Sequence, residues 1–370
     1  MGKNDKIVYI LGAGCSSGQQ PDGPGFPLAR DFASALEAFS KEQLVSDNCQ
    51  KLRTLVTETV DLLRREKVQT LDALAARLGS ESQGSQSYSL TQTQKQMLRR
   101  QVGNARIATA ALFMYLEKNA KQVGLPRYDY FLTELFGNST DWAKASRNSN
   151  ANILTFNYDR LFEMAFIDRF KCDTGLHPLY GKSLLNSGWD YIQGNSFDVS
   201  PDRFAFLKLH GSVGVRAREE GDHNPQIYTY YDGLPGDEQT LIDDERFFAY
   251  SQNVNPYEHD PEPLIVFPHE KPFVTAGTKT LLSFRSYIPN VWAEAKRLIS
   301  EATAIWAIGY SFAPMDRADV LDLFRSTTKC KKLIVQNTPG TAEMICARLQ
   351  KKWFEPENIV LSVEPYPHPF

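Results

Sequence analysis

Two short apolar runs of this sequence, at 151–156 and 204–209, end in polar side chains that could act on a bound ligand. Asn157 and Asp159 follow the first run, and His210 follows the second. A histidine with an unperturbed pKa of about 6.5 can accept a proton near neutral pH. An amide and a carboxylate can orient a hydroxyl group or a water molecule beside it. A structural interpretation stays open, because Asn157 also suits a turn and Asp159 also suits a helix cap.

A glycine-rich turn follows the first apolar run of the chain, residues 6–11. Gly12 and Gly14 let the backbone turn tightly and approach a pyrophosphate, whose charge the N-terminus of a following helix would favour. A simple tight turn explains the two glycines about as well. In a nicotinamide-dependent dehydrogenase the second strand and its ribose-binding acid come roughly 20 residues later. The next strand pattern here starts at residue 151, so the spacing disfavours a dehydrogenase.

Two later segments carry polar residues in a similar position after an apolar run. Gly309 permits a close approach of a ligand, and Ser311, two residues on, can bind a phosphate or a ribose. Asn337 follows the run at 332–336, where its amide could bind ribose hydroxyls. Each of these residues by itself suits turn chemistry as well as it suits a ligand contact.

The spacing of the apolar runs predicts a scaffold that would bring these residues together. In the last third of the chain, helices are expected at 289–301, 316–325 and 340–352, and strands at 304–309, 332–336 and 358–363. Such alternation is typical of βαβ units. The predicted fold class is therefore α/β, a Rossmann-like doubly wound parallel sheet, in which ligands bind at the carboxyl ends of the strands.

A long helical pattern interrupts this scheme and predicts a discontinuous domain. Residues 1–40 and 150–370 would form the Rossmann-type domain, and residues 41–149 a large α-helical insertion. A Ser/Gln-rich stretch near 80–96 is expected to be a loop within the insertion. Residues 213–288 are rich in proline and predict irregular structure with a strand near 264–267.

Composition narrows the class of protein. The 370 residues include 41 Lys and Arg against 44 Asp and Glu, a net charge of −3, which argues against a protein that binds a nucleic-acid backbone. No apolar stretch approaches the roughly 18 residues of a membrane span, so a soluble, cytoplasmic protein is expected. The five cysteines form no C-x-x-C pair, and this pattern predicts neither disulfides nor a metal site.

Taken in order, the motifs resemble those of the sirtuin (silent information regulator) family. The resembling pieces are Gly12-Ala13-Gly14-Cys15-Ser16, Thr155-Phe156-Asn157-Tyr158-Asp159, Leu209-His210-Gly211-Ser212 and Gly309-Tyr310-Ser311. The Asn-Tyr-Asp, Leu-His-Gly-Ser and Gly-Tyr-Ser forms look most like the bacterial sirtuin-like NAD hydrolases of anti-phage defence. The resemblance covers roughly residues 1–40 and 150–340 and leaves out the helical insertion. The deacylating sirtuins carry a zinc module with two C-x-x-C pairs, and this chain has none.

The resemblance implies a role for each matching residue. His210 would be the base, Asn157 would orient water and the ribose, and Asp159 would hold the carboxamide of nicotinamide or offset positive charge. The expected contacts to the rest of NAD, the substrate, are Gly12, Ala13, Gly14, Ser16, Thr155, Gly309, Ser311 and Asn337.

The function implied by the resemblance is hydrolysis of NAD⁺ to nicotinamide and ADP-ribose, in a regulated, NAD-depleting defence effector. One alternative is an NAD-dependent protein deacylase or ADP-ribosyltransferase, and another is a non-catalytic subunit that senses NAD or ADP-ribose. A homo-oligomer is expected, since the apolar helix faces of the insertion at 44–63 and 105–116 could form an interface, although the same faces also suit the core of a helical subdomain. A HerA-type ATPase or an Argonaute-like protein is the expected kind of defence partner.

Overall fold

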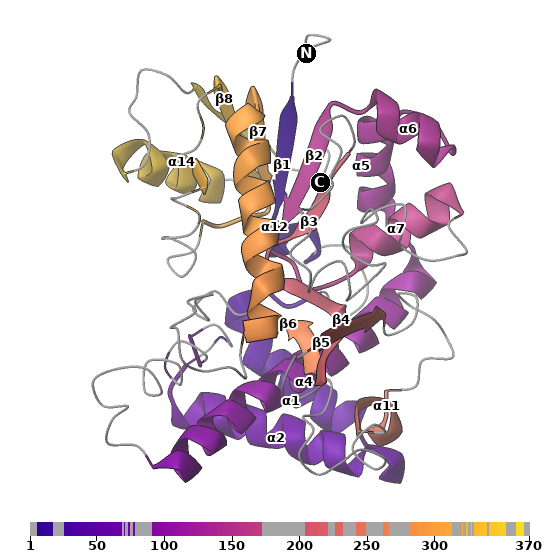
Figure 1. Ribbon diagram of the computed structural model, residues 1–370, viewed down its shortest axis with the longest axis vertical. Helices are drawn as coiled ribbons and strands as arrows, with labels where there is room; N and C mark the ends of the chain where they lie inside the picture. The colour runs from indigo at the N-terminus through magenta and orange to yellow at the C-terminus, as the bar shows by residue number, and fades with distance from the viewer. Residues whose placement is uncertain are drawn as a thin grey trace.

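A six-stranded parallel sheet forms the centre of the protein in the computed structural model (Figure 1). Its strands are β1 (Ile7–Leu11), β2 (Ala151–Thr155), β3 (Phe206–Lys208), β7 (Ala304–Ile308), β8 (Lys332–Asn337) and β9 (Val360–Pro365). The order across the sheet is β3-β2-β1-β7-β8-β9, and all neighbours are parallel. This is the strand order of a doubly wound dinucleotide-binding sheet, so the predicted fold class is confirmed.

The structure describes residues 6–17, 26–68, 70, 73–74, 77, 91–171, 204–220, 226–231, 242–248, 262–265, 282–312, 320, 323–324, 327, 329–338, 340–352 and 360–365. Most of the helix predicted at 316–325 lies outside these residues, and so do residues 80–90 of the predicted loop. Among the described residues, no helix is both long enough and apolar enough to cross a membrane.

Helices flank the sheet on both sides. Figure 1 shows α5 (Pro126–Phe136), α6 (Trp142–Asn148) and α7 (Leu161–Phe170) on one side of the strands and α14 (Thr341–Lys352) on the other, while α12 (Leu282–Glu301) crosses in front. The ring of Phe131 on α5 packs edge-on against Tyr9 on β1 and against Phe162 on α7. Although α5 lies in the range predicted for the insertion, it therefore packs against the sheet.

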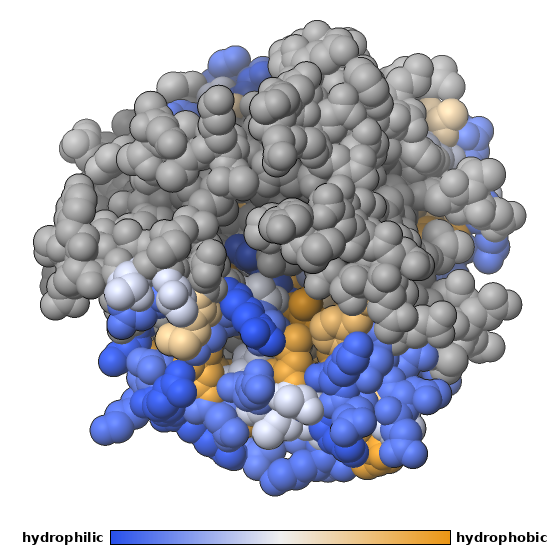
Figure 2. Space-filling view, turned by 60° about the horizontal axis from the view of Figure 1, so that its bottom comes forward, coloured by the Kyte–Doolittle hydropathy of each residue, from blue (hydrophilic) through white to orange (hydrophobic). Residues whose placement is uncertain are grey.

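Two long helices of the predicted insertion, α2 (Gln50–Arg65) and α4 (Gln92–Val123), form a separate layer below the sheet. They contact α1 (Phe32–Glu42), most of which lies in the range predicted for the Rossmann-type domain. The short helix α11 (Asp244–Phe248) joins this layer, because the carboxylate of Asp244 accepts hydrogen bonds from the first backbone N–H groups of α2. Figure 2 turns the layer toward the viewer and shows a mainly hydrophilic surface with hydrophobic residues between the polar ones.

The predicted loop at 80–96 extends too far, because α4 already begins at Gln92. Thr91 caps this helix: its hydroxyl accepts from Gln94 N at 3.2 Å, and the Gln94 side chain accepts from Thr91 N at 2.8 Å. This reciprocal pair satisfies two backbone N–H groups that would otherwise lack partners, and it starts a helix within a sequence poor in apolar residues.

A second, antiparallel sheet corrects the expectation of irregular structure at 213–288. It contains β4 (Gly211–Glu220), β5 (Gln226–Tyr231) and β6 (Glu262–Ile265) in the order β5-β4-β6. Charged residues in the second half of β4 weaken the hydrophobic pattern by which a strand is recognised. The sheet contacts α4, where Arg106 Nε donates to the carbonyl oxygen of Ile265 at 2.9 Å.

Three glycines allow the loops after β1 and β7 to touch at the point where the strand order reverses. A Cβ atom on Gly12 would lie 2.5 Å from the Cα atom of Tyr310, and one on Gly14 would lie 2.8 Å from the Cα atom of Gly309. Gly309 has a φ of +60°, and a Cβ there would lie 2.5 Å from Cys15 N. The glycines are thus required by backbone packing, whatever ligand binds nearby.

We expect Gly309→Ala to destabilise the protein much more than Gly340→Ala. Both positions have positive φ, which costs an L-residue about 1–2 kcal/mol. Only at Gly309 does the added carbon also meet backbone atoms, which raises the expected loss to about 3 kcal/mol or more. Denaturant unfolding of the two variants measures the difference, and equal losses would show that the loops separate at little cost.

Candidate functional site

Two backbone hydrogen bonds bring the loops after β2 and β3 together at the carboxyl edge of the sheet. Leu209 N donates to the carbonyl oxygen of Thr155 at 2.9 Å, and Val213 N donates to that of Tyr158 at 3.0 Å. His210 lies between these two anchors on one loop, and Asn157 lies between them on the other. The structure thus places side by side the loops that carry two of the three residues predicted to be catalytic.

Aromatic rings surround His210. The centroid of its ring lies 5.0 Å from that of Phe156, 6.1 Å from that of Tyr158 and 6.3 Å from that of Trp292. Trp292 is held in place by its Nε1 atom, which donates to the carbonyl oxygen of Leu209 at 3.0 Å. The histidine is 6% exposed, so it can meet a ligand only from a narrow direction, in surroundings that exclude most water.

A buried hydrogen-bond network joins the loop after β1 to the loop after β2. The amide Nδ2 of Asn157 donates to the carbonyl oxygen of Gly12 at 3.0 Å and to Ser16 Oγ at 3.3 Å. Ser16 Oγ in turn donates to Asp159 Oδ2 at 2.9 Å. None of the described residues donates to Asn157 Oδ1, which leaves this atom as an acceptor for a hydroxyl group of a ligand.

Asp159 combines both interpretations that the sequence left open. The N-cap of α7 is Arg160 and not Asp159 as predicted, but Asp159 Oδ1 still accepts a hydrogen bond from Leu161 N, the first residue of the helix, at 3.2 Å. Its other oxygen faces Ser16 in the network at the sheet edge. Burial raises the pKa of this carboxyl to about 6, although the charge of Lys208 acts in the opposite direction. The residue therefore titrates close to neutral pH.

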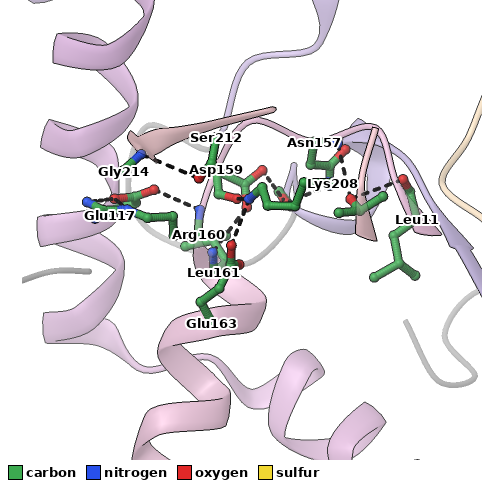
Figure 3. Close-up of polar contacts among 12 residues, drawn as sticks. Leu11, Glu117, Asn157, Asp159, Arg160, Leu161, Glu163, Lys208, Ser212 and Gly214 are labelled. Atoms are coloured by element: carbon green, nitrogen blue, oxygen red, sulfur yellow. Dashed lines mark hydrogen bonds and ion pairs between the residues drawn. The ribbon is translucent and has the colours of Figure 1, made fainter. Parts of the chain in front are cut away.

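Two buried ion pairs flank Asp159 (Figure 3). Lys208 Nζ lies 2.8 Å from Glu163 Oε1 and also donates to the backbone carbonyl of Asp159. On the other side, the guanidinium of Arg160 binds Glu117 on α4, with Nε and one terminal nitrogen 2.9 and 2.7 Å from Oε2. All four of these side chains are almost wholly buried.

Arg160 fits against the second sheet because residue 214 is a glycine. A Cβ atom on Gly214 of β4 would lie 2.4 Å from Arg160 Cδ. The backbone of Arg160 is held as well, since its N–H donates to Glu117 Oε1 at 2.7 Å. Glu117 therefore fixes both the side chain and the backbone of the residue next to Asp159.

In the expected phosphate-binding turn, the N–H groups of Gly12, Gly14 and Ser16 are already used in hydrogen bonds within the protein. Gly12 N donates to the carbonyl oxygen of Ile308, and Gly14 N donates to that of Gly309, both at 3.0 Å. The N–H of Ser16 is bound within its own turn, to the carbonyl oxygen of Ala13 at 3.1 Å. Ala13 itself is exposed at the tip of the turn. These residues shape the edge of the site through packing.

The remaining predicted binding residues divide between the two halves of the sheet. The Thr155 hydroxyl is used inside the protein, since it donates to the carbonyl oxygen of Leu11 at 3.4 Å and accepts from Asn157 N at 3.1 Å. Ser311 is exposed just after β7, and Asn337 ends the neighbouring strand β8. The last two thus lie across β1 from Asn157, at the second half of the carboxyl edge.

Sequence reasoning missed the charged residues that support the site. Lys208 and Glu163 stand inside apolar runs, and a charge in such a run is expected to be paired when the run is buried. That signal marks the two residues without telling which partner each one has. Glu117 and Tyr128 lie far from any motif, and no pattern in the sequence points to them.

Comparison with known proteins assigns no function to this site. No family model matches the chain, and no curated protein matches it. Among the described residues, no group of three or more His, Cys, Asp or Glu side chains is placed to hold a metal ion. The function has to be argued from the site itself.

We expect Asp159→Asn to remove part of the pH dependence of the protein's stability. The pKa of this carboxyl is about 6 in the folded protein and about 4 in an unfolded chain, so the folded state binds more protons between these values. The free energy of unfolding of the wild type therefore falls by about 3 kcal/mol as the pH rises from about 4 to about 6. An asparagine at this position has no charge to bury, so the variant lacks this decrease. Unfolding curves from pH 4 to 8 measure this, and parallel curves for the two proteins would contradict it.

We expect Glu117→Gln to cost about 3–5 kcal/mol, because it leaves the Arg160 charge buried without its counter-charge. The matched control is Glu37→Gln. It removes a carboxylate that binds Lys41 and Arg64 at the surface, where ion pairs contribute little. Denaturant unfolding compares the two variants. A similar small loss in both would mean that water reaches Arg160.

Proposed function

We propose that this protein hydrolyses NAD⁺ at the bond between nicotinamide and ribose, giving nicotinamide and ADP-ribose. The observation that carries the proposal is the charge of the buried cluster beneath the site. Its anionic groups are Glu117, Asp159 and Glu163, and its cationic groups are Arg160 and Lys208. With Asp159 ionised, these five buried side chains carry three negative and two positive charges, a balance of −1. A ligand with one positive charge, such as the pyridinium of NAD⁺, would neutralise it.

The same charge suits the reaction as well as the binding. Nicotinamide leaves as a neutral molecule, and positive charge moves onto the ribose in an oxocarbenium-like transition state. A fixed carboxylate in a water-poor site stabilises such charge without having to reorganise. No general acid is needed for this leaving group, because it departs as a neutral molecule.

His210 and Asn157 would supply the other two requirements, a base and an orienting group. The ring of His210 lies at the end of β3, enclosed by aromatic rings, where it would take a proton from water or from a ribose hydroxyl. The amide nitrogen of Asn157 is fixed by Gly12 and Ser16, which leaves its oxygen to orient that hydroxyl or water. Both side chains are held before any ligand arrives.

The strand order indicates how the dinucleotide would lie. Doubly wound sheets bind dinucleotides across the point where the strand order reverses, which here is between β1 and β7. The nicotinamide half would lie over β2 and β3, beside Asn157 and His210. The adenosine half would reach Ser311 and Asn337 beyond β7 and β8. The resemblance to sirtuin-like NAD hydrolases extends the proposal to a regulated role in anti-phage defence.

We expect His210→Ala and Asn157→Ala each to lower NAD⁺ turnover by about 10²–10⁴-fold, the usual effect of losing a general base or an orienting group. The measurement is nicotinamide release from NAD⁺ by chromatography, with a melting curve for each variant. Asn152→Ala is the matched control, because Asn152 lies on the same strand β2 and its side chain binds Ala205 N away from the site. That variant should keep the wild-type rate.

The outcomes separate this proposal from its alternatives. Release that requires an acylated peptide or a protein acceptor would indicate a deacylase or an ADP-ribosyltransferase. NAD⁺ binding in a calorimeter with no release would indicate a sensing subunit. A folded His210→Ala variant with the full rate would overturn the assignment of the base.

A further inference from the structure

Tyr128 on α5 reaches the candidate site from a part of the chain that carries no motif. Its side chain is buried, and its hydroxyl oxygen lies 3.1 Å from Ser16 Oγ, 112 residues earlier in the chain. The ring packs edge-on against Phe162, with centroids 6.2 Å apart. A buried hydroxyl group destabilises a protein unless it is hydrogen-bonded, and this one is bonded to the site.

The number of hydrogens at Ser16 sets the direction of this bond. The Ser16 hydroxyl has one hydrogen, and it donates this hydrogen to Asp159 Oδ2, because an ionised carboxylate can only accept. Asn157 Nδ2 donates to the same Ser16 oxygen. In its contact with Ser16, Tyr128 must therefore be the donor. The three groups form one chain of donors, from Tyr128 through Ser16 to Asp159.

We infer that Tyr128 is a positioning residue that acts through Ser16 to keep the Asp159 carboxylate ionised and fixed beside Asn157. The donors from Tyr128 and Asn157 occupy both lone pairs of the Ser16 oxygen, so its hydrogen can point only toward Asp159. Each donor in such a series strengthens the next one, and surroundings of low polarity increase the effect. Removing the phenol hydroxyl would weaken the last bond, the one to the carboxylate.

The phenol is suited to this role because it stays protonated. Burial raises the pKa of Tyr128 well above its ordinary value, and the negative charge of Asp159 raises it further. Packing against Phe162 holds the ring in place, so α5 keeps the hydroxyl within hydrogen-bond distance of Ser16.

The other titratable groups around Asp159 do not replace the Tyr128 hydroxyl as a donor. They are Cys15 after β1, Glu117 on α4, Arg127 on α5, Glu163 on α7, Lys208 on β3 and Arg160 on the same loop. Lys208 favours the charged carboxyl and Glu163 opposes it, while Glu117 neutralises Arg160. Burial raises the pKa of the Cys15 thiol far above its ordinary value, so it stays neutral.

Protonation of Asp159 would disrupt the chain of hydrogen bonds from Tyr128 through Ser16. A proton on Oδ2 would present Ser16 with a third donor, and a proton on Oδ1 would face the N–H of Leu161. One of these contacts would then break, and the support that Ser16 gives Asn157 would change with it. The catalytic meaning of this coupling rests on the proposed function, but the hydrogen-bond chain itself can be measured without NAD⁺.

The test is a titration of Asp159 in the full chain labelled with ¹³C at the aspartate carboxyl carbons. The Asp159 resonance is the one missing from Asp159→Asn, and its shift is followed from pH 4 to 9. We expect Tyr128→Phe to move the midpoint upward by about 0.5 pH unit or more. Tyr130→Phe is the control, because Tyr130 lies on the same helix with 42% of its surface exposed, and the midpoint should stay in place.

The results of this titration can be distinguished from those of the nicotinamide-release assay that tests the proposed function. A folded Tyr128→Phe variant with an unchanged midpoint overturns the inference, and a purely structural role would lower the melting temperature without moving the midpoint. Should this variant fail to fold, Ser16→Ala breaks the chain at its middle and must raise the midpoint, or the inference fails. A moved midpoint without any nicotinamide release would support the chain and count against NAD⁺ hydrolysis. If nicotinamide is released, the acid limb of the pH profile of kcat/KM should move together with the midpoint of the Asp159 titration.

Discussion

The buried ion pair between Arg160 and Glu117 is the constraint on which the rest of the site depends. Neither charge can remain in the interior without the other, because an unpaired buried charge is far more costly than a paired one. Helix α4 must therefore stay against the loop after β2, and β4 must carry a glycine where the guanidinium passes. One interaction thus fixes the helical layer, the second sheet and the loop of Asp159 relative to one another. Packing of apolar surfaces alone would not specify that position.

Asp159 lies inside this arrangement as the one carboxylate without a cation of its own. Lys208 is engaged by Glu163, and Arg160 by Glu117, so Asp159 depends on dipoles: the hydroxyl of Ser16 and the N–H of Leu161. Burial raises its pKa to about 6, because the charge of Lys208, which is shared with Glu163, offsets only part of the cost of burying the carboxylate. Strongly perturbed carboxyl groups concentrate where proteins bind or transform ligands, although structural networks produce them too. The convergence of Asn157 and His210 on the same edge favours the functional explanation.

The sheet and the edge that bears the polar residues could be predicted from the sequence, because both depend on local patterns. Short runs such as Ile7–Leu11 and Ala151–Thr155 have the composition of buried strands, and their polar residues come directly after them. The supporting contacts could not be predicted in this way. Glu117 and Arg160 are 43 residues apart, and Ser16 and Tyr128 are 112 apart, so only the folded chain brings them together. The antiparallel sheet was missed because charged residues in β4 weaken its strand pattern and because β4 also pairs with β6 across a long segment of chain.

The glycine turn after β1 shows how a motif can be satisfied by packing before any ligand is considered. A Cβ atom at Gly12 or Gly14 would collide with the backbone of Gly309 and Tyr310, so glycine is required there even in a protein that binds no phosphate. The N–H groups of the same two glycines bind carbonyl oxygens of the β7 end of the sheet. A doubly wound sheet with such closely packed loops would need these glycines whatever it binds. The glycines therefore identify the place where the strand order reverses. The chemistry of the site depends on groups that glycine cannot supply: a fixed charge, a base and an oriented amide.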